Sequence, residues 1–228
     1  MRLVILGLPG SGKGTQSRRI SQRFGIPQIS TGDILRQAVK EETELGKKAR
    51  HFMDKGLLVP DALMVELVIQ RLQGRDCRGG FILDGFPRNI AQAKTLDDLL
   101  AEKNMPLDAV LKLRVSDEAV IRRLSHRRLC SQCGADYNLL TNPPKQEGLC
   151  DRCGGGLYQR EDDRKETIAR RLQVYHLHTK PLQAYYRNKG SLLIFDAQKE
   201  VEEVSAEVTD VLKSRANMMS IEQSKLEA

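Results

Sequence analysis

Gly7-Leu8-Pro9-Gly10-Ser11-Gly12-Lys13-Gly14-Thr15 is the stretch that decides the fold. It follows a short apolar run, residues 2–6, that is typical of a buried strand, and a polar helix is predicted from Lys13 to Phe24. A glycine-rich turn between a strand and a helix lets backbone N–H groups turn onto phosphate oxygens, and the helix start adds a positive dipole. The stretch therefore predicts a phosphate-binding loop, with Lys13 reaching the terminal phosphates of a nucleotide.

Strand and helix patterns alternate along most of the chain, which predicts an α/β fold with a parallel sheet and helices on both faces. Further strands are expected at residues 26–30, 81–84, 109–115 and 192–195. The helix after the second strand is expected to start near Ile34, capped by Thr31 or Asp33. Asp84 ends a buried strand, and its carboxylate is placed to hold Mg²⁺ directly or through water. After the last strand a helix is predicted from Val201 to about Lys213, and the remaining tail either extends it or is disordered.

Composition limits the class of protein. The 228 residues carry 37 Lys and Arg against 30 Asp and Glu, so a formal charge of +7 favours a polyanionic partner: nucleic acid, an anionic membrane or a small phosphorylated substrate. No apolar run approaches the roughly 18 residues of a membrane span. The first residues, Met1 to Gly14, lack the long apolar region of a secretory signal. We therefore expect a cytoplasmic protein with no membrane partner.

Four of the five cysteines form two Cys-x-x-Cys pairs. The pairs are Cys130 with Cys133 and Cys150 with Cys153. This spacing predicts a closed, structural four-thiolate metal site, with Zn²⁺ as the default ion and Co²⁺ or Fe²⁺ as possible substitutes. Two disulfides or free thiols are the other readings. The surrounding residues 129–163 show little periodicity and are too few for a core of their own, so metal binding would stabilise this insertion.

Four motifs, taken together, resemble the adenylate kinase family, and their order and spacing match its long bacterial form. They are Gly7–Gln16, Ser30-Thr-Gly-Asp33, Asp84-Gly-Phe-Pro-Arg88 and Arg160-Glu-Asp-Asp163, and the likeness covers about Met1 to Leu212. The resemblance implies a P-loop NTPase-type core with a parallel five-stranded sheet, comprising residues 1–29, 60–125 and 164–228. It also implies a helical nucleoside monophosphate-binding flap at 30–59 and a metal-binding lid at 126–163.

The activity implied by this resemblance is reversible phosphoryl transfer, in which Mg-ATP and AMP give two ADP, for adenine nucleotide homeostasis. Mg²⁺ would accompany ATP, and the family expectation is a monomer. The resemblance also implies the site residues, motif by motif. ATP would contact Gly10, Ser11, Gly12, Lys13, Gly14, Thr15, Arg123, Arg127, Asp136, Tyr137 and Lys199. AMP would contact Thr31, Arg36, Leu57, Leu58, Val59, Gly85, Phe86, Pro87, Arg88, Gln92, Arg160 and Arg171. The catalytic set would be Lys13, Asp84, Arg88, Arg123, Arg127, Arg160 and Arg171.

The chemistry explains why arginines recur in these motifs. Two polyanions must meet end to end, so positioning and charge stabilisation dominate, and guanidinium groups grip phosphate oxygens in a fork. Arg123 and Arg127 are four residues apart, so we expect one helix face to present both. For AMP, Gln92 can donate to and accept from the adenine edge, and Thr31 can offer a hydroxyl.

Three other functions remain open at this point. The first is a kinase for UMP, CMP or another monophosphate. The second is a basic four-cysteine nucleic-acid-binding protein, against which stand the absence of Trp and a surplus of only four positive charges between Arg122 and Arg171. The third is a metal-dependent redox sensor or ATP-binding switch with little turnover.

Overall fold

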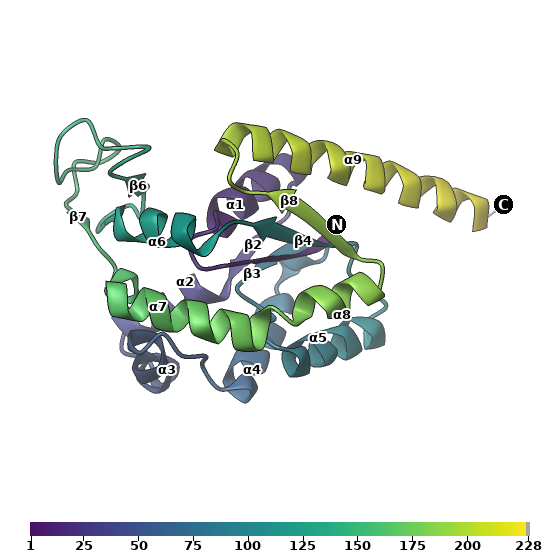
Figure 1. Cartoon of the computed structure of the whole chain (residues 1–228). Helices are drawn as coiled ribbons and strands as arrows, with labels where there is room; N and C mark the ends of the chain where they lie inside the picture. Colours follow the sequence, from purple (N-terminus) through teal and green to yellow (C-terminus); the bar gives the residue numbers. More distant parts are fainter. Residues whose placement is uncertain (227–228) are drawn as a thin grey trace.

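The computed structural model describes residues 1–226 (Figure 1). The elements in chain order are β1 (Arg2–Gly7), α1 (Lys13–Phe24), β2 (Gln28–Ser30), α2 (Thr31–Lys40), α3 (Glu44–Asp54), α4 (Asp61–Leu72), η1 (Arg75–Cys77), β3 (Phe81–Asp84), α5 (Ile90–Glu102), β4 (Ala109–Arg114), α6 (Asp117–Ser125), β5 (Arg127–Cys130), β6 (Asp136–Asn138), β7 (Leu157–Tyr158), η2 (Glu161–Asp163), α7 (Lys165–Val174), η3 (Tyr175–Thr179), α8 (Leu182–Asn188), β8 (Leu192–Asp196) and α9 (Val201–Leu226).

Five parallel strands form the central sheet in the order β2-β3-β1-β4-β8. The first strand, β1, lies in the middle and pairs with β3 on one side and β4 on the other. This confirms the predicted α/β class with its five-stranded parallel sheet. Because the strands are parallel, the phosphate loop after β1 and Asp84 at the end of β3 lie at the same edge of the sheet.

Helices cover both faces of the sheet, as the alternating side chains of β1 require. Leu3 and Ile5 pack with residues of α1 and α9, which lie together on one face (Figure 1). Val4 and Leu6 belong to the core on the opposite face, where α2, α4, α5 and α8 contribute their apolar residues. Two apolar layers thus hold the strand ends rigid beneath the site.

A second sheet is small and antiparallel, with the strand order β6-β5-β7. It projects from the body between α6 and α7 (Figure 1). Its core consists of Cys130, Ala135, Tyr137 and Cys150, with Leu157 packed against them. This sheet lies inside the predicted lid, residues 126–163, whose boundaries stay a prediction.

Three local predictions need correction or completion. Ser30, not Thr31 or Asp33, caps α2 by accepting from Asp33 N at 3.3 Å, so the helix begins at Thr31 instead of near Ile34. Arg123 and Arg127 do not share a helix face, because α6 ends at Ser125. Arg127 lies in β5, where it is paired with Asn138 of β6. The last helix continues past Lys213 to Leu226, so the described part of the tail is helical.

No helix in residues 1–226 is both long enough and apolar enough to cross a membrane.

Candidate functional site

The phosphate loop joins β1 to α1 through glycines with left-handed backbone angles. Gly10 has φ +74°, and a Cβ there would lie 2.7 Å from Leu124 Cγ of α6, so both backbone and packing require glycine. Gly12, with φ +92°, caps α1 without a side-chain hydrogen bond. The start of α1 therefore presents backbone N–H groups and a positive dipole end to the loop, as anion binding requires.

Lys13 is half-buried at the base of this loop. Its Nζ donates to the carbonyls of Gly7 at 2.9 Å and Leu8 at 2.8 Å. Burial lowers the pKa of Lys13 to about 7, although the Asp84 carboxylate acts in the opposite direction. Burial also raises the pKa of Asp84, which Lys13 partly offsets. A half-buried cation and a buried carboxylate thus interact at the edge of the sheet.

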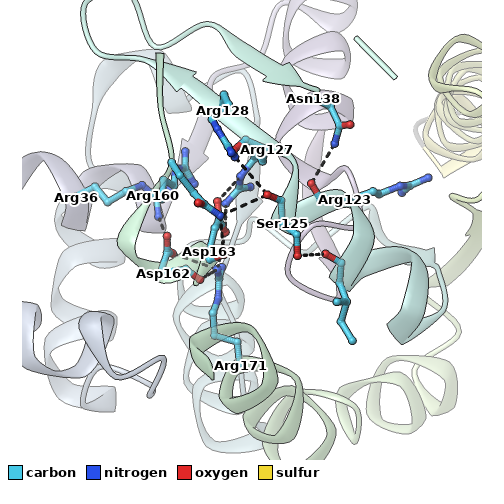
Figure 2. A network of polar contacts seen from close by, with 12 residues as sticks. Arg36, Arg123, Ser125, Arg127, Arg128, Asn138, Arg160, Asp162, Asp163 and Arg171 are labelled. Atoms are coloured by element: carbon cyan, nitrogen blue, oxygen red, sulfur yellow. Dashed lines mark hydrogen bonds and ion pairs between the residues drawn. The ribbon is translucent and has the colours of Figure 1, made fainter. Parts of the chain in front are cut away.

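Arginines from separate elements converge on Asp162 and Asp163 (Figure 2). The Asp163 carboxylate accepts two hydrogen bonds from Arg127, from Nε at 2.8 Å and Nη2 at 2.7 Å. It also lies 3.3 Å from Arg171 Nη1. Asp162 Oδ2 lies 3.3 Å from the same Arg171 atom, and the Asp162 carbonyl accepts from it at 2.8 Å. The two carboxylates therefore tie β5 and α7 to η2.

The remaining members of the cluster come from α2 and from the residue directly before η2. Arg36 of α2 lies 2.5 Å from Asp33 and 4.0 Å from Asp162, while Arg160 lies 3.8 Å from Asp33. Burial lowers the pKa of Arg160 to about 10, and the charges of Arg36 and Arg127 act in the same direction. Burial alone would raise the pKa of Asp162, but Arg171 and its neighbouring arginines hold it below its ordinary value. The cluster thus concentrates positive charge that two phosphorylated ligands would neutralise.

Arg88 stands in the loop between β3 and α5. Its Nε donates to the Gly85 carbonyl at 2.8 Å, and its own carbonyl accepts from Thr179 Oγ1 at 2.8 Å. Burial lowers the pKa of Arg88 to about 10, and Arg171 adds to the effect. The side chain and the backbone of Arg88 are therefore both held in place, and a second half-buried arginine, Arg171, lies nearby.

A pocket opens beside this cluster. Its lining includes many of the residues predicted to bind AMP: Arg36, Leu57, Leu58, Val59, Arg88, Gln92 and Arg171. Gly32, Leu35, Met53, Gly56, Met64 and Asp162 complete the lining. The lining combines apolar side chains with three arginines, which suits a base joined to a phosphate.

The rest of the predicted AMP set surrounds the pocket without lining it. Thr31 is fully buried and donates to the Asp84 carbonyl at 3.3 Å. Gly85 has φ +87°, and a Cβ there would lie 2.7 Å from Thr31 Oγ1. Phe86 belongs to the hydrophobic core, and Pro87 is buried. These residues build the wall behind the pocket.

Three of the residues predicted to bind ATP lie apart from the arginine cluster: Arg123, Tyr137 and Lys199. A fourth, Asp136, lies near Arg127 and Arg160, whose positive charges partly offset the rise in its pKa that desolvation causes. Arg123 is directed away from it (Figure 2) and donates to the Ala197 carbonyl at 2.8 Å. Asp136 is exposed at the start of β6, and Lys199 forms ion pairs with Glu203 and Glu207 of α9. The Tyr137 hydroxyl contacts Cys150 Sγ at 3.4 Å, so its side chain belongs to the cysteine cluster.

The four paired cysteines are brought together by the small sheet. Their sulfur atoms all lie within 4.8 Å of one another, with Cys130 and Cys153 at 3.4 Å and Cys133 and Cys150 at 3.6 Å. Tetrahedral Zn²⁺ with bonds of about 2.3 Å would hold its sulfurs about 3.8 Å apart. The donor set and its dimensions therefore fit such an ion. Cys133 N also points to Cys130 Sγ at 3.5 Å, and Arg152 N points to Cys150 Sγ at 3.4 Å, as thiolate ligands require.

Sequence reasoning missed three acidic residues of this site. Asp162 and Asp163 lie in the Arg160-Glu-Asp-Asp163 motif. Three acidic residues beside one arginine are a signal that could have predicted ion pairs with arginines elsewhere in the chain. Asp61 accepts from Gln92 Nε2 at 2.7 Å and from Asn89 Nδ2 at 2.9 Å. Nothing in the local sequence distinguishes Asp61 from an ordinary acidic residue at a helix start.

Comparison with known proteins agrees with this geometry. A family model described as adenylate kinase matches residues 5–191. The adenylate kinase of Caldicellulosiruptor saccharolyticus is 56% identical over 212 residues, which is 93% of this chain and 99% of that protein. The adenylate kinase of Archaeoglobus fulgidus is 53% identical over 213 residues, 93% of this chain and 98% of that protein. The adenylate kinase of Bacillus licheniformis is 50% identical over 215 residues, 94% of this chain and 99% of that protein.

A family model that covers most of the sequence, and relatives at least half identical along nearly all of it, mean that this chain belongs to the adenylate kinase family.

Proposed function

We propose that the protein transfers the γ-phosphoryl group of ATP to AMP and releases two ADP, in a reversible reaction. The observation that carries this proposal is the meeting of Arg36, Arg88, Arg127, Arg160 and Arg171 at a pocket that three of them, Arg36, Arg88 and Arg171, line. Five arginines from separate elements exceed what one nucleotide needs, and they suit two phosphate chains brought end to end.

The step itself exchanges one phosphorus–oxygen bond for another. A phosphate oxygen of AMP attacks the γ-phosphorus of ATP, and the bond from that phosphorus to the β-phosphate bridging oxygen breaks, so both products are ADP. The residues Gly10 to Thr15 would hold the ATP phosphates through backbone N–H groups, and Lys13 would neutralise the transferred group. Arg88 and Arg171 would hold the AMP phosphate in line for attack.

Mg²⁺ bound between the phosphates would neutralise charge on ATP, and Asp84 and Thr15 are the residues we expect to hold it, directly or through water. The burial that raises the pKa of Asp84 favours this role, because a nearby divalent cation would offset the unfavourable buried negative charge.

We expect the AMP base to bind among the apolar lining residues Leu57, Val59 and Met64. Gln92 also lines the pocket and can pair with the adenine edge, whereas Thr31 is not in the lining and donates to the Asp84 carbonyl. This arrangement favours AMP over the pyrimidine monophosphates that a UMP or CMP kinase would accept.

The lid is proposed to close over ATP as a unit, excluding water that would otherwise accept the phosphoryl group. Arg127 and Arg160 would move with it and, together with Arg123, close over the phosphates. Asp136 and the main chain of Tyr137 would approach the base and ribose, with Lys199 nearby. Structural Zn²⁺ on Cys130, Cys133, Cys150 and Cys153 would stabilise this small sheet, since its core is only a few residues. Co²⁺ or Fe²⁺ could occupy the same thiolates.

We place the protein in the cytoplasm, where a reducing environment would keep the cysteines out of disulfides and available as thiolate ligands. We propose a monomer, because residues of one chain supply every proposed contact with ATP and AMP. Nucleic acid is not a proposed partner, since the arginines are half-buried around a pocket instead of spread over a face.

The test measures ADP formation from Mg-ATP with AMP, GMP, UMP or CMP, and with no acceptor. Fast turnover with AMP alone is the expected result. Turnover with a pyrimidine monophosphate would mean that the protein is a kinase for that acceptor. ADP formation without any acceptor would indicate an ATPase. Absence of ADP from folded, metal-loaded protein would overturn the proposal in favour of a nucleotide-binding switch.

A further inference from the structure

Two hydrogen bonds fix the direction of the Gln92 side-chain amide. Its Oε1 accepts from Arg88 N at 2.7 Å, and its Nε2 donates to Asp61 Oδ1 at 2.7 Å. A backbone N–H only donates and a carboxylate only accepts, so both partners dictate the same orientation. Gln92 is 1% exposed, so a flipped amide would leave buried groups without partners.

Asp61 is itself held in place. Asn89 Nδ2 donates to Asp61 Oδ1 at 2.9 Å and to Oδ2 at 3.0 Å. Asn89 cannot reverse its own amide, because its Oδ1 caps α5 by accepting from Gln92 N at 2.9 Å. The carboxylate at the start of α4 is therefore locked to the start of α5, and Gln92 is locked to the carboxylate.

The orientation matters because Gln92 lines the pocket. After these two bonds, Oε1 can still accept once and Nε2 can still donate once. Adenine presents a donating 6-amino group beside the accepting N1, which matches an oxygen beside an N–H. Hypoxanthine and guanine present an accepting 6-oxygen beside a donating N1–H, which matches only the reversed amide.

We infer that Asp61 is a positioning residue that selects 6-amino over 6-oxo purine monophosphates, by holding the Gln92 amide in the orientation that fits adenine. The inference rests on the proposed function, since it assumes that the purine base reaches Gln92.

The test compares AMP with inosine monophosphate, because the two differ only at the edge in question. In the full-length, metal-loaded protein, Asp61→Ala should lower the ratio of kcat/KM for AMP to that for inosine monophosphate by about tenfold, as expected when a flipped amide becomes accessible. Asp61→Asn keeps one accepting oxygen and should retain part of the selectivity. Glu66→Ala is the matched control, because Glu66 is exposed on the same helix, and it should leave the ratio unchanged.

A second comparison separates positioning from general stability. In a Gln92→Ala background, Asp61→Ala should change the ratio no further, because the residue acts through Gln92. A ratio within about twofold of wild type in folded Asp61→Ala, or an equal fall in both backgrounds, would overturn the inference. Where Asp61→Ala does not fold, the Asp61→Asn ratio decides in the same way.

Binding constants for both monophosphates, measured by calorimetry, separate a failure of the proposed function from a failure of the role of Asp61. A wild-type protein that prefers AMP in binding but forms no ADP would overturn the proposed function and leave the role of Asp61 intact. A protein that phosphorylates AMP but binds the two purines equally would overturn the role of Asp61 alone.

Discussion

Lys13 shows how the site prepares a cation for phosphate. Burial lowers its pKa to about 7, so the free site holds a lysine that is easily deprotonated above neutral pH. Phosphate oxygens close to Nζ favour the charged form and would raise that pKa. The lysine therefore becomes fully cationic only when its ligand arrives.

Proton uptake on nucleotide binding follows from this shift. At about pH 8, free Lys13 is mostly neutral and bound Lys13 mostly charged, so binding of ATP should take up close to one proton. Calorimetry in two buffers of different ionisation enthalpy measures that number. At about pH 6 the lysine is already protonated in the free protein, so the uptake should vanish. An uptake that does not change between these pH values would contradict the assignment.

Arg88 has a different task, because its guanidinium is held by Gly85 while its backbone is held by Gln92 and Thr179. Arg88→Lys keeps a positive charge but loses the fork, and we expect kcat/KM to fall about 100-fold. Arg164→Lys is the control, because Arg164 is exposed and pairs only with Glu161 among the ion pairs found. Thermal unfolding of both variants should stay near that of wild type. An equal loss of activity and stability at Arg88 would contradict a role in phosphate positioning.

At the scale of elements, η2 works as a joint because its Asp163 is bonded to β5 on one side and α7 on the other. The Asp163 side chain is fully buried, and removing one partner of a buried charge network leaves the other charges uncompensated. Asp163→Asn should lower the free energy of unfolding by about 3 kcal/mol.

Glu161 provides the matched control for this joint, since it lies in the same short helix and forms an exposed pair with Arg164. Glu161→Gln should change the free energy of unfolding by less than about 0.5 kcal/mol. Urea denaturation of the two variants measures the difference. Comparable small effects in both would mean that Asp163 does not hold the joint.

The small sheet depends on its four cysteines more than on apolar packing. Replacing Cys130 and Cys150 by Ser should release the metal, lower the Tm and expose residues 131–156 to protease, because metal binding is coupled to folding of so small a core. Cys77→Ala should retain the metal, since Cys77 lies in the main core. Elemental analysis and limited proteolysis measure both effects, and an unchanged metal content in the double variant would reject the four-thiolate site.

The elements also show where sequence reasoning succeeded and where it stopped. The strands, α1 and the cysteine pairs were predictable, because short continuous apolar runs, a glycine-rich turn and fixed ligand spacing are local signals. Arg127 was misplaced on a helix because the end of α6 is set by pairing of β5 with β6, which only the folded chain brings together. Asp61 and Asp163 escaped for the same reason, since their partners lie 31 and 36 residues away.

At the scale of the whole molecule, the last helix, α9, continues well past its last core residue. Leu212 is the last residue of α9 in the core among the side chains that the structure describes, and the helix runs on beyond the sheet (Figure 1). Truncation after Lys213 should therefore leave the Tm and kcat close to those of the full chain. Thermal unfolding and the ADP assay measure this, and a Tm lowered by many degrees would mean that the extension supports the fold.

The central place of β1 has a consequence for how the chain is made. On a ribosome β1 emerges well before its two neighbours, β3 and β4, which lie about 80 and 107 residues further along the sequence. Its apolar side chains must stay out of aggregates while those neighbours are translated, and β8 joins the edge of the sheet later still. Nascent chains stalled before residue 81 should thus be the ones that chaperones bind most firmly.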